Sequence, residues 1–302
     1  MDEKQQILFL KKALKAEIAA FCRRGAGTWK EAVSETVKEI REHRWQAVFF
    51  GGTLRSLLWS RVKENAPGRP RDIDIVTQGA RLADLEDAFR PYIERYTRFG
   101  GLKLARTGSH AGASKWEFDI WPLEETFAIK EAGKKFPTFR DLPETTFFNV
   151  ESIAVDVWAR AGQGRRIFSK DDQFFKGVVR RTLEVNNWCN PFPELCVARA
   201  IVMASQLEWK IGPKLLRYLS EFGSSMSEAD FERVQKDHYG SVRLHGGAFS
   251  RAMNGVADAI ERGENNAVEL VLPSRLALWP EDEEHVHRLW IRSVAQAGRG
   301  KK

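Results

Sequence analysis

The sequence predicts an α+β fold, in which a region with a small mixed sheet precedes a mainly helical region. Short apolar or alternating segments occur within residues 45–140, and apolar residues at helical spacing dominate beyond Pro191. The 302 residues, 43% of them hydrophobic, suffice for one large or two modest domains with ordinary cores. This composition excludes a disordered tail protein and a small disulfide-stabilised domain.

The N-terminal 44 residues are expected to form two helices that pack on the next domain. Apolar residues recur at helical spacing over residues 2–22, and the glycine-rich stretch that follows ends this helix. Thr28 and Glu31 have the spacing of a capping box, which predicts a second helix extending to about residue 44.

Residues 45–140 are predicted to form the mixed domain. Its elements follow the order strand, Gly-Gly turn, helix, turn-rich loop and strand, and then a helix and two further strands. The strands are expected over residues 47–50, 72–77, 102–106 and 115–121, and the helices over residues 54–62 and 82–89.

Residues 141–302 are predicted to form a neck and a helical body. Short β-like stretches come first, and segments with helical apolar spacing follow them. The strands are expected over residues 153–158 and 165–168, and the helices over residues 195–207, 214–222, 228–236, 248–260 and 283–295.

Charge and cysteine content narrow the functional classes. The formal net charge of +7 and pI of about 9.3 favour polyanionic partners such as nucleic acids or nucleotides. The three cysteines lack CxxC spacing, which argues against a disulfide framework or a thiolate zinc site and fits a reducing cytoplasm. Because the N-terminus is polar and no run of about 18 apolar residues occurs, we expect a cytoplasmic protein without a signal peptide or membrane span.

Asp72 and Asp74 occupy alternate positions of a predicted strand. Residues two apart in a strand point to the same face, so the two carboxylates converge while Ile73 turns into the core. Such carboxylates repel each other unless a cation lies between them, and Mg²⁺ prefers a few carboxylate oxygens with phosphate oxygens and water. The pair therefore predicts a metal and nucleotide site, although a single acid-x-acid triplet is also typical of two solvated acids on an edge strand.

A pair of glycines precedes these acids at a predicted strand-to-helix junction. Gly51 and Gly52 would let phosphates approach the backbone, and the helix start would offer N–H groups and a positive dipole. Arg55 adds a bidentate phosphate partner. Most Gly-Gly pairs only permit a tight turn, so this motif gains weight from its neighbours.

Glu117 and Asp119 repeat the acid-x-acid spacing on a later predicted strand. A third carboxylate would complete a two-metal site, in which one ion activates a hydroxyl nucleophile and the other stabilises the leaving pyrophosphate. Asp119 is the preferred third catalytic and metal-binding residue because its apolar neighbours mirror those of the first pair. Glu117 is the alternative.

Together these motifs resemble the head of the class II CCA-adding enzymes and bacterial poly(A) polymerases, in the DNA polymerase β nucleotidyltransferase superfamily. The resemblance extends over about residues 45–210 in the family's order. It rests on Gly51-Gly52-Thr53-Leu54-Arg55, on Arg71-Asp72-Ile73-Asp74-Ile75-Val76-Thr77, and on residues 148–156, 172–180 and 191–209.

The resemblance implies a polymerase β-like nucleotidyltransferase head followed by a helical neck and body. It also implies that a 3′-hydroxyl attacks the α-phosphate of a nucleoside triphosphate (NTP), with Mg²⁺ as cofactor. The implied acceptor is the 3′ end of an RNA, and tRNA is the first candidate. Asp72 and Asp74 would be the metal ligands. The implied nucleotide-binding residues are Gly51, Gly52, Arg55 and Arg199.

The chain departs from the family at several positions. Ser56 replaces a usual aspartate, Glu151 replaces a usual asparagine, and Thr145-Thr146-Phe147 replaces an arginine-arginine-aspartate triplet. Residues 189–193 read Cys-Asn-Pro-Phe-Pro where the family has a glutamate-aspartate-x-x-arginine template for the incoming base. The sequence therefore supports nucleotidyl transfer more strongly than ordered addition of C, C and A.

Two other classes remain open. A nucleotidyltransferase acting on a protein hydroxyl or a small molecule would not need the missing base-reading template, although Asn190 or Glu194 could offer polar contacts to a base. A non-catalytic nucleotide- or RNA-binding relative would have kept the fold alone, and the intact Asp72 and Asp74 argue against it.

A basic cluster with interspersed aromatic residues is a candidate for RNA contact. Arginine and lysine would dock backbone phosphates, and a phenylalanine could stack a terminal base, whereas solvated charges over buried phenylalanines are an equally ordinary arrangement. The cluster comprises Arg160, Arg165, Arg166, Lys170, Lys176, Arg180 and Arg181 with Phe168, Phe174 and Phe175.

Overall fold

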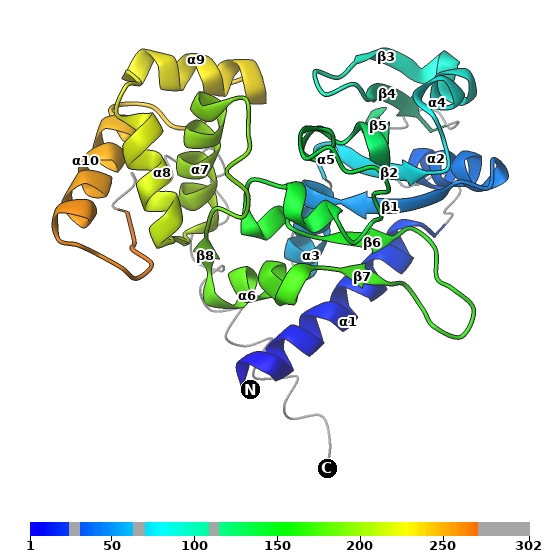
Figure 1. Ribbon diagram of the computed structural model, residues 1–302, viewed down its shortest axis with the longest axis horizontal. Helices are drawn as coiled ribbons and strands as arrows, with labels where there is room; N and C mark the ends of the chain where they lie inside the picture. Colours follow the sequence, from blue (N-terminus) through cyan, green and yellow to red (C-terminus); the bar gives the residue numbers. More distant parts are fainter. Residues whose placement is uncertain (24–30, 63–69, 109–114, 271–302) are drawn as a thin grey trace. The chain divides into compact units, whose positions relative to one another are not determined.

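The computed structural model describes residues 1–23, 31–62, 70–108 and 115–270, and it divides into two compact units (Figure 1). Within the described residues, the first unit comprises Met1–Thr145 and Glu151–Asp172, and the second comprises Thr146–Val150 and residues 173–270. The division at residues 44 and 140 expected from the sequence stays a prediction. None of the described helices is both long and apolar enough to cross a membrane.

A seven-stranded mixed sheet forms the centre of the first unit, in the order β3-β4-β5-β2-β1-β6-β7 (Figure 1). Strands β2 and β5 pair in parallel, whereas every other neighbouring pair is antiparallel. This sheet confirms the α+β class with a mixed sheet. The strands are β1 (Gln46–Phe50), β2 (Ile73–Gln78), β3 (Ile93–Tyr96), β4 (Leu102–Thr107), β5 (Lys115–Pro122), β6 (Ala154–Asp156) and β7 (Ile167–Phe168).

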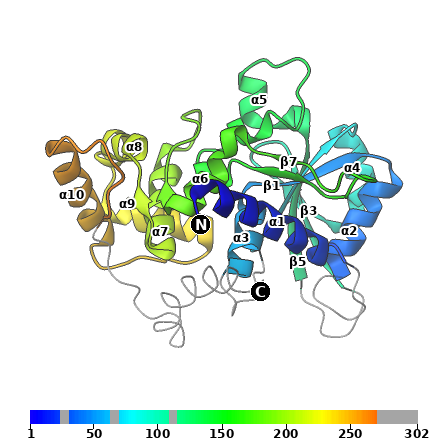
Figure 2. The same cartoon turned by 90° about the horizontal axis from the view of Figure 1, so that it is seen from below.

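Helix α1 covers one face of this sheet (Figure 2). It begins with a capping box at Asp2, and its last residue, Phe21, packs its ring 5.8 Å from Phe49 of β1 and 6.1 Å from Trp116 of β5. The other helices of the unit are α2 (Glu31–Glu42), α3 (Gly51–Val62), α4 (Leu82–Phe89) and α5 (Phe127–Glu131), and α1 itself is Glu3–Phe21. Thr28, the expected cap of the second helix, lies outside the described residues.

An apolar cluster covers part of the opposite face. Val48 of β1 and Val76 of β2 are register partners at its centre, and Phe50 extends it. Residues that follow β5, among them Leu123, Ile129, Phe139 and Leu142, close over these side chains. Because alternate residues of β2 share a face, Asp74 lies on the same side of the sheet as Val76.

The second unit is mainly helical, as expected for the body. Helix α7 is its most buried element, and the Tyr218 ring of α8 lies 4.7 Å from Phe147. Its elements are α6 (Gln173–Arg180), β8 (Thr182–Leu183), α7 (Pro193–Leu207), β9 (Lys210–Ile211), α8 (Pro213–Gly223), α9 (Glu228–Tyr239) and α10 (Ala248–Glu261). The expected helix over residues 283–295 lies outside the described residues.

Several described elements differ from the sequence-based expectation, two of them for a clear physical reason. Strand β3 was not expected, because its side chains are mostly polar and three of its four residues are exposed. Helix α3 begins at Gly51 rather than at residue 54, since the φ of +56° at this glycine turns the chain from β1 directly into the helix. Strand β6 is shorter than the expected 153–158.

Candidate active site

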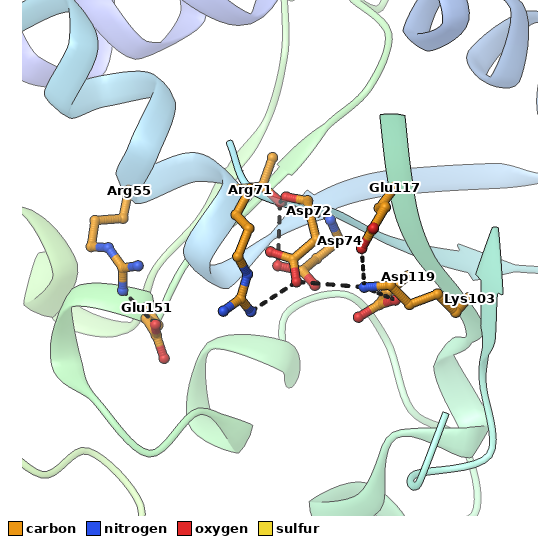
Figure 3. Close-up of polar contacts among 9 residues, drawn as sticks. Arg55, Arg71, Asp72, Asp74, Lys103, Glu117, Asp119 and Glu151 are labelled. Atoms are coloured by element: carbon orange, nitrogen blue, oxygen red, sulfur yellow. Dashed lines mark hydrogen bonds and ion pairs between the residues drawn. The ribbon is translucent and has the colours of Figure 1, made fainter. Parts of the chain in front are cut away.

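The three aspartates singled out in the sequence lie together on one face of the sheet (Figure 3). Asp72 directly precedes β2, Asp74 lies within it, and Asp119 is the register partner of Asp74 across the parallel β2–β5 pair. Ile73 between the first two is completely buried on the other face, as expected. Of the two acids considered as the third carboxylate, Asp119 and not Glu117 is the register partner of Asp74.

Thr53, in the first turn of α3, fixes the position of Asp74. Its Oγ1 accepts a hydrogen bond from the Asp74 N–H at 2.7 Å and donates one to Asp74 Oδ2 at 3.2 Å. The Thr53 side chain is 1% exposed, so water competes little for these bonds. The junction between β1 and α3 therefore holds the carboxylate as well as shaping the turn.

The two glycines of this junction have different roles. The Gly51 N–H donates to Ile153 O at 3.1 Å, so this group already has a partner within the protein. A Cβ atom at Gly52 would stand 3.8 Å from Asp74 Oδ2 and from Glu151 Oε1, which is ordinary contact distance. Gly52 thus leaves open the space in front of the carboxylate, where a phosphate was expected.

Arg55 forms an ion pair with Glu151, on the other side of Asp74 from Asp119 (Figure 3). The Glu151 side chain is 9% exposed, which makes the pair well shielded from water. A phosphate bound by Arg55 would have to share this guanidinium with Glu151. Glu151, the residue that departs from the family pattern, is therefore the local counter-charge of Arg55.

Two cations lie among the acids. Arg71 Nη2 is 3.0 Å from Asp72 Oδ2. Lys103 of β4, the register partner of Asp119, places its Nζ 3.0 Å from Glu117 Oε2, 3.4 Å from Asp119 Oδ1 and 3.8 Å from Asp72 Oδ2. The ammonium therefore faces three carboxylates at once (Figure 3).

The electrostatic environment separates the three aspartates. Burial raises the pKa of Asp74 well above its usual range, and the charges of Asp72, Asp119 and Glu151 raise it further. Burial likewise raises the pKa of Asp119 against the opposing charge of Lys103. Burial opposes ionisation of Asp72 too, but Arg71 and Lys103 outweigh it and lower the pKa of this carboxyl.

The donor chemistry fits a hard divalent cation, but the side chains are arranged around an ammonium. Asp119 Oδ1 is buried and, in the part of the chain that the structure describes, has no hydrogen bond. Carboxylate oxygens of this kind are the protein ligands that Mg²⁺ prefers. Within the same described residues, no group of three or more His, Cys, Asp or Glu side chains is drawn together closely enough to hold a metal ion. The Lys103 ammonium lies close to the carboxylates of both Asp72 and Asp119.

Arg199 lies on α7 in the second unit. Its guanidinium is 5.3 Å from the centre of the Phe148 ring, a cation–π distance. Two polar residues offered by the sequence for base contacts already have partners there: Asn190 Oδ1 accepts from the Phe192 N–H at 2.8 Å, and Glu194 pairs with Arg233 at 3.3 Å.

Two of the three phenylalanines in the basic cluster are not available for stacking. Phe174 and Phe175 are completely buried, because the apolar face of α6 belongs to the core of the second unit. The expectation that they stack a base is therefore wrong. In the first unit, Arg166 pairs with Asp156 at 2.8 Å and Lys170 with Glu144 at 3.0 Å, so these charges are partly neutralised.

Sequence reasoning missed Lys103 and Thr53. A lysine between Leu102 and Leu104 is typical of a strand with one solvated face, and only the β4–β5 register shows that it meets Asp119. Thr53 stands within the quoted glycine motif, but nothing in the spacing indicates that its hydroxyl reaches Asp74. Pairing β4 with β5 as an antiparallel hairpin would have been the usable signal for Lys103.

Among the comparisons with known proteins, only the one with solved structures found matches. No family model and no curated protein matches the chain. Among solved structures, an apo tRNA-processing enzyme is similar at 15% identity and a TM-score of 0.46, over 66% of this chain and 52% of its own. A CCA-adding enzyme complexed with CTP is similar at 15% and 0.46, over 74% of this chain and 49% of its own.

A tRNA nucleotidyltransferase complexed with a primer tRNA and an incoming ATP analogue is similar at 16% identity and a TM-score of 0.44, over 66% of this chain and 54% of its own. This chain thus spans about half the length of the solved structures it resembles. The names of these solved structures include CCA-adding enzyme, one of the classes that the sequence motifs resemble.

Proposed function

We propose that this chain is a Mg²⁺-dependent nucleotidyltransferase, which transfers a nucleoside monophosphate from an NTP to an acceptor hydroxyl. The observation that carries the proposal is the convergence of Asp72, Asp74 and Asp119 on adjacent parallel strands, held there although like charges repel. Keeping three acids this close is costly for a fold and is understandable if a cation is to be bound.

Each residue has a role that follows from its place. Asp72 and Asp74 would hold a divalent cation, and Asp119 would assist the ion that lowers the pKa of the acceptor hydroxyl. Thr53 keeps the Asp74 carboxylate in position. A bound divalent cation would lower the pKa of the attacking hydroxyl and neutralise charge that develops on the phosphates.

The groups around the acids would receive the triphosphate. Gly52 leaves room in front of Asp74, and Arg55, tethered by Glu151, supplies a guanidinium close to that space. Preorganised cations of this kind stabilise the charge of the departing pyrophosphate. The proposed role of Arg199 in nucleotide binding rests on the sequence resemblance alone.

The acceptor proposed first is the 3′ end of an RNA, with tRNA as the leading candidate. The net charge of +7 favours such a polyanion. One observation favours a second candidate, a protein or small-molecule hydroxyl. Asn190 and Glu194, the two polar residues considered for base contact, are paired within the second unit with the Phe192 N–H and with Arg233.

The test is transfer of label from each α-labelled NTP in the presence of Mg²⁺. The acceptors are a tRNA lacking its 3′ terminus, the protein itself and a small-molecule extract, and the control is Asp72→Asn combined with Asp74→Asn. Label in tRNA supports the first acceptor, and the choice among NTPs then reveals base selectivity. Label in protein or small molecules supports the second acceptor. Wild-type protein that labels nothing would overturn the proposed catalysis and leave a non-catalytic nucleotide- or RNA-binding protein.

A further inference from the structure

Lys103 lies within the site, although nucleotidyl transfer by metal-bound acids does not by itself require a lysine there. Its side chain is 11% exposed, and it projects from β4 onto the sheet face that carries the three aspartates (Figure 3). A lysine that is this little exposed is expensive to keep unless its ammonium is paired. In the structure the ammonium of Lys103 is paired with the carboxylates of Asp72, Glu117 and Asp119, which compensate for its burial.

The distances put the ammonium where a cation of the site would be expected. Nζ lies 3.4 Å from Asp119 Oδ1 and 3.8 Å from Asp72 Oδ2, so it stands between the two acids. The third contact, 3.0 Å to Glu117 Oε2, ties it to the more exposed edge of the cluster. Asp74 takes its side-chain hydrogen bond from Thr53.

We propose that Lys103 is a positioning residue that reserves the place between Asp72 and Asp119, so that the protein without nucleotide binds one divalent cation rather than two. The inference rests on the proposed metal-dependent function. A divalent cation would need carboxylate oxygens at about 2.1 Å, and the ammonium repels it from the same oxygens. A second ion therefore enters only when the phosphates of a bound NTP add negative charge.

The test counts bound Mn²⁺, used as the probe for Mg²⁺, by titration of the full chain with electron paramagnetic resonance detection of the free ion. Without nucleotide, the wild type should bind one Mn²⁺. Lys103→Met, which keeps the length of the side chain and removes its charge, should bind two, with the second ion at least about tenfold tighter than any second ion in the wild type. A non-hydrolysable NTP should bring the wild type to two.

Matched controls separate charge from folding. Lys103→Arg keeps a cation in place and should still bind one ion. Lys134→Met removes an equal charge from an exposed pair with Asp141 and should leave the count at one. Circular dichroism melting reports whether each variant is folded, and Lys103→Gln replaces Lys103→Met if the latter is not.

Each outcome decides between the two proposals. A wild type that binds two Mn²⁺ without nucleotide, or that binds Mn²⁺ only with nucleotide, overturns the role of Lys103 and leaves nucleotidyl transfer intact. A folded Lys103→Met or Lys103→Gln that still binds one does the same. A wild type that binds no Mn²⁺ with or without nucleotide overturns the metal site, and the proposed function fails with it.

Discussion

The two ends of one sheet face in the first unit are stabilised in opposite ways. Towards its end, β2 contributes Val76 to a dry cluster with Val48 and Leu142, where burial of apolar surface favours folding. At its start the same face presents Asp72 and Asp74, where burial and like charges oppose ionisation. Strand β2 therefore stabilises the fold at one end and carries buried acids, which destabilise it, at the other.

The largest expected effect is on the acidic end. Asp74→Asn keeps an oxygen that can accept from Thr53 but removes the charge that would hold the cation. We expect nucleotidyl transfer to fall by about a thousandfold or more, equivalent to about 4 kcal/mol of barrier. Steady-state rates with labelled NTP measure it, with Asp87→Asn as the exposed acidic control. Activity within tenfold of the wild type would contradict the assignment.

The apolar end should respond in the opposite manner. Val76 is completely buried, so Val76→Ala removes two methyl groups from the packed cluster. The free energy of unfolding should fall by about 2 kcal/mol, while the folded protein keeps its rate. Urea denaturation gives the first quantity, and activity at a temperature where both proteins are folded gives the second. A folded Val76→Ala that is inactive would show that the two ends are not independent.

Thr53 connects the start of α3 to the acidic end of the sheet face. Removal of its hydroxyl should have an intermediate effect on activity and stability. Thr53→Val keeps the shape but leaves the Asp74 N–H without its partner, which costs about 1–2 kcal/mol. We expect kcat/KM to fall about tenfold with a similar loss of stability. Thr53→Ser keeps the hydroxyl and should recover most of both. A serine variant that is impaired while the valine variant behaves like the wild type would point to the methyl group instead.

The smallest expected effect is a pH-dependent stability difference. Burial and neighbouring acids raise the pKa of Asp74, so its protonated form stabilises the fold below about pH 4, and this contribution is lost as pH rises towards the raised value. Asp74→Asn cannot ionise. Its Tm, measured by calorimetry without divalent cations, should therefore gain on that of the wild type as pH increases. A difference in Tm between the two proteins that does not change with pH would contradict this explanation.

The sequence predicted correctly those features of the site that depend on the alternation of residues within a single strand. The alternation around Ile73 predicted that Asp72 and Asp74 share a face, and the repeated acid spacing led to Asp119. Lys103 was missed because its partners lie on or beside other strands, and the spacing of residues within one strand does not reveal the register between strands. Strand β3 escaped for a related reason, since an exposed edge strand needs no apolar alternation. Phe174 and Phe175 were offered as stacking residues because sequence composition does not distinguish a buried ring from an exposed one.

The parallel pairing of β2 with β5 also orders events along the growing chain. A tight turn cannot join parallel strands, so β5 docks beside β2 only after α4, β3 and β4 have been synthesised. Loop closure opposes that docking, and the approach of Asp119 to Asp72 adds repulsion. Lys103 precedes Asp119 in the sequence and lies on the strand that β5 joins. The nascent chain therefore carries this neutralising charge before Asp119 emerges, which lowers the electrostatic cost of docking β5 beside β2.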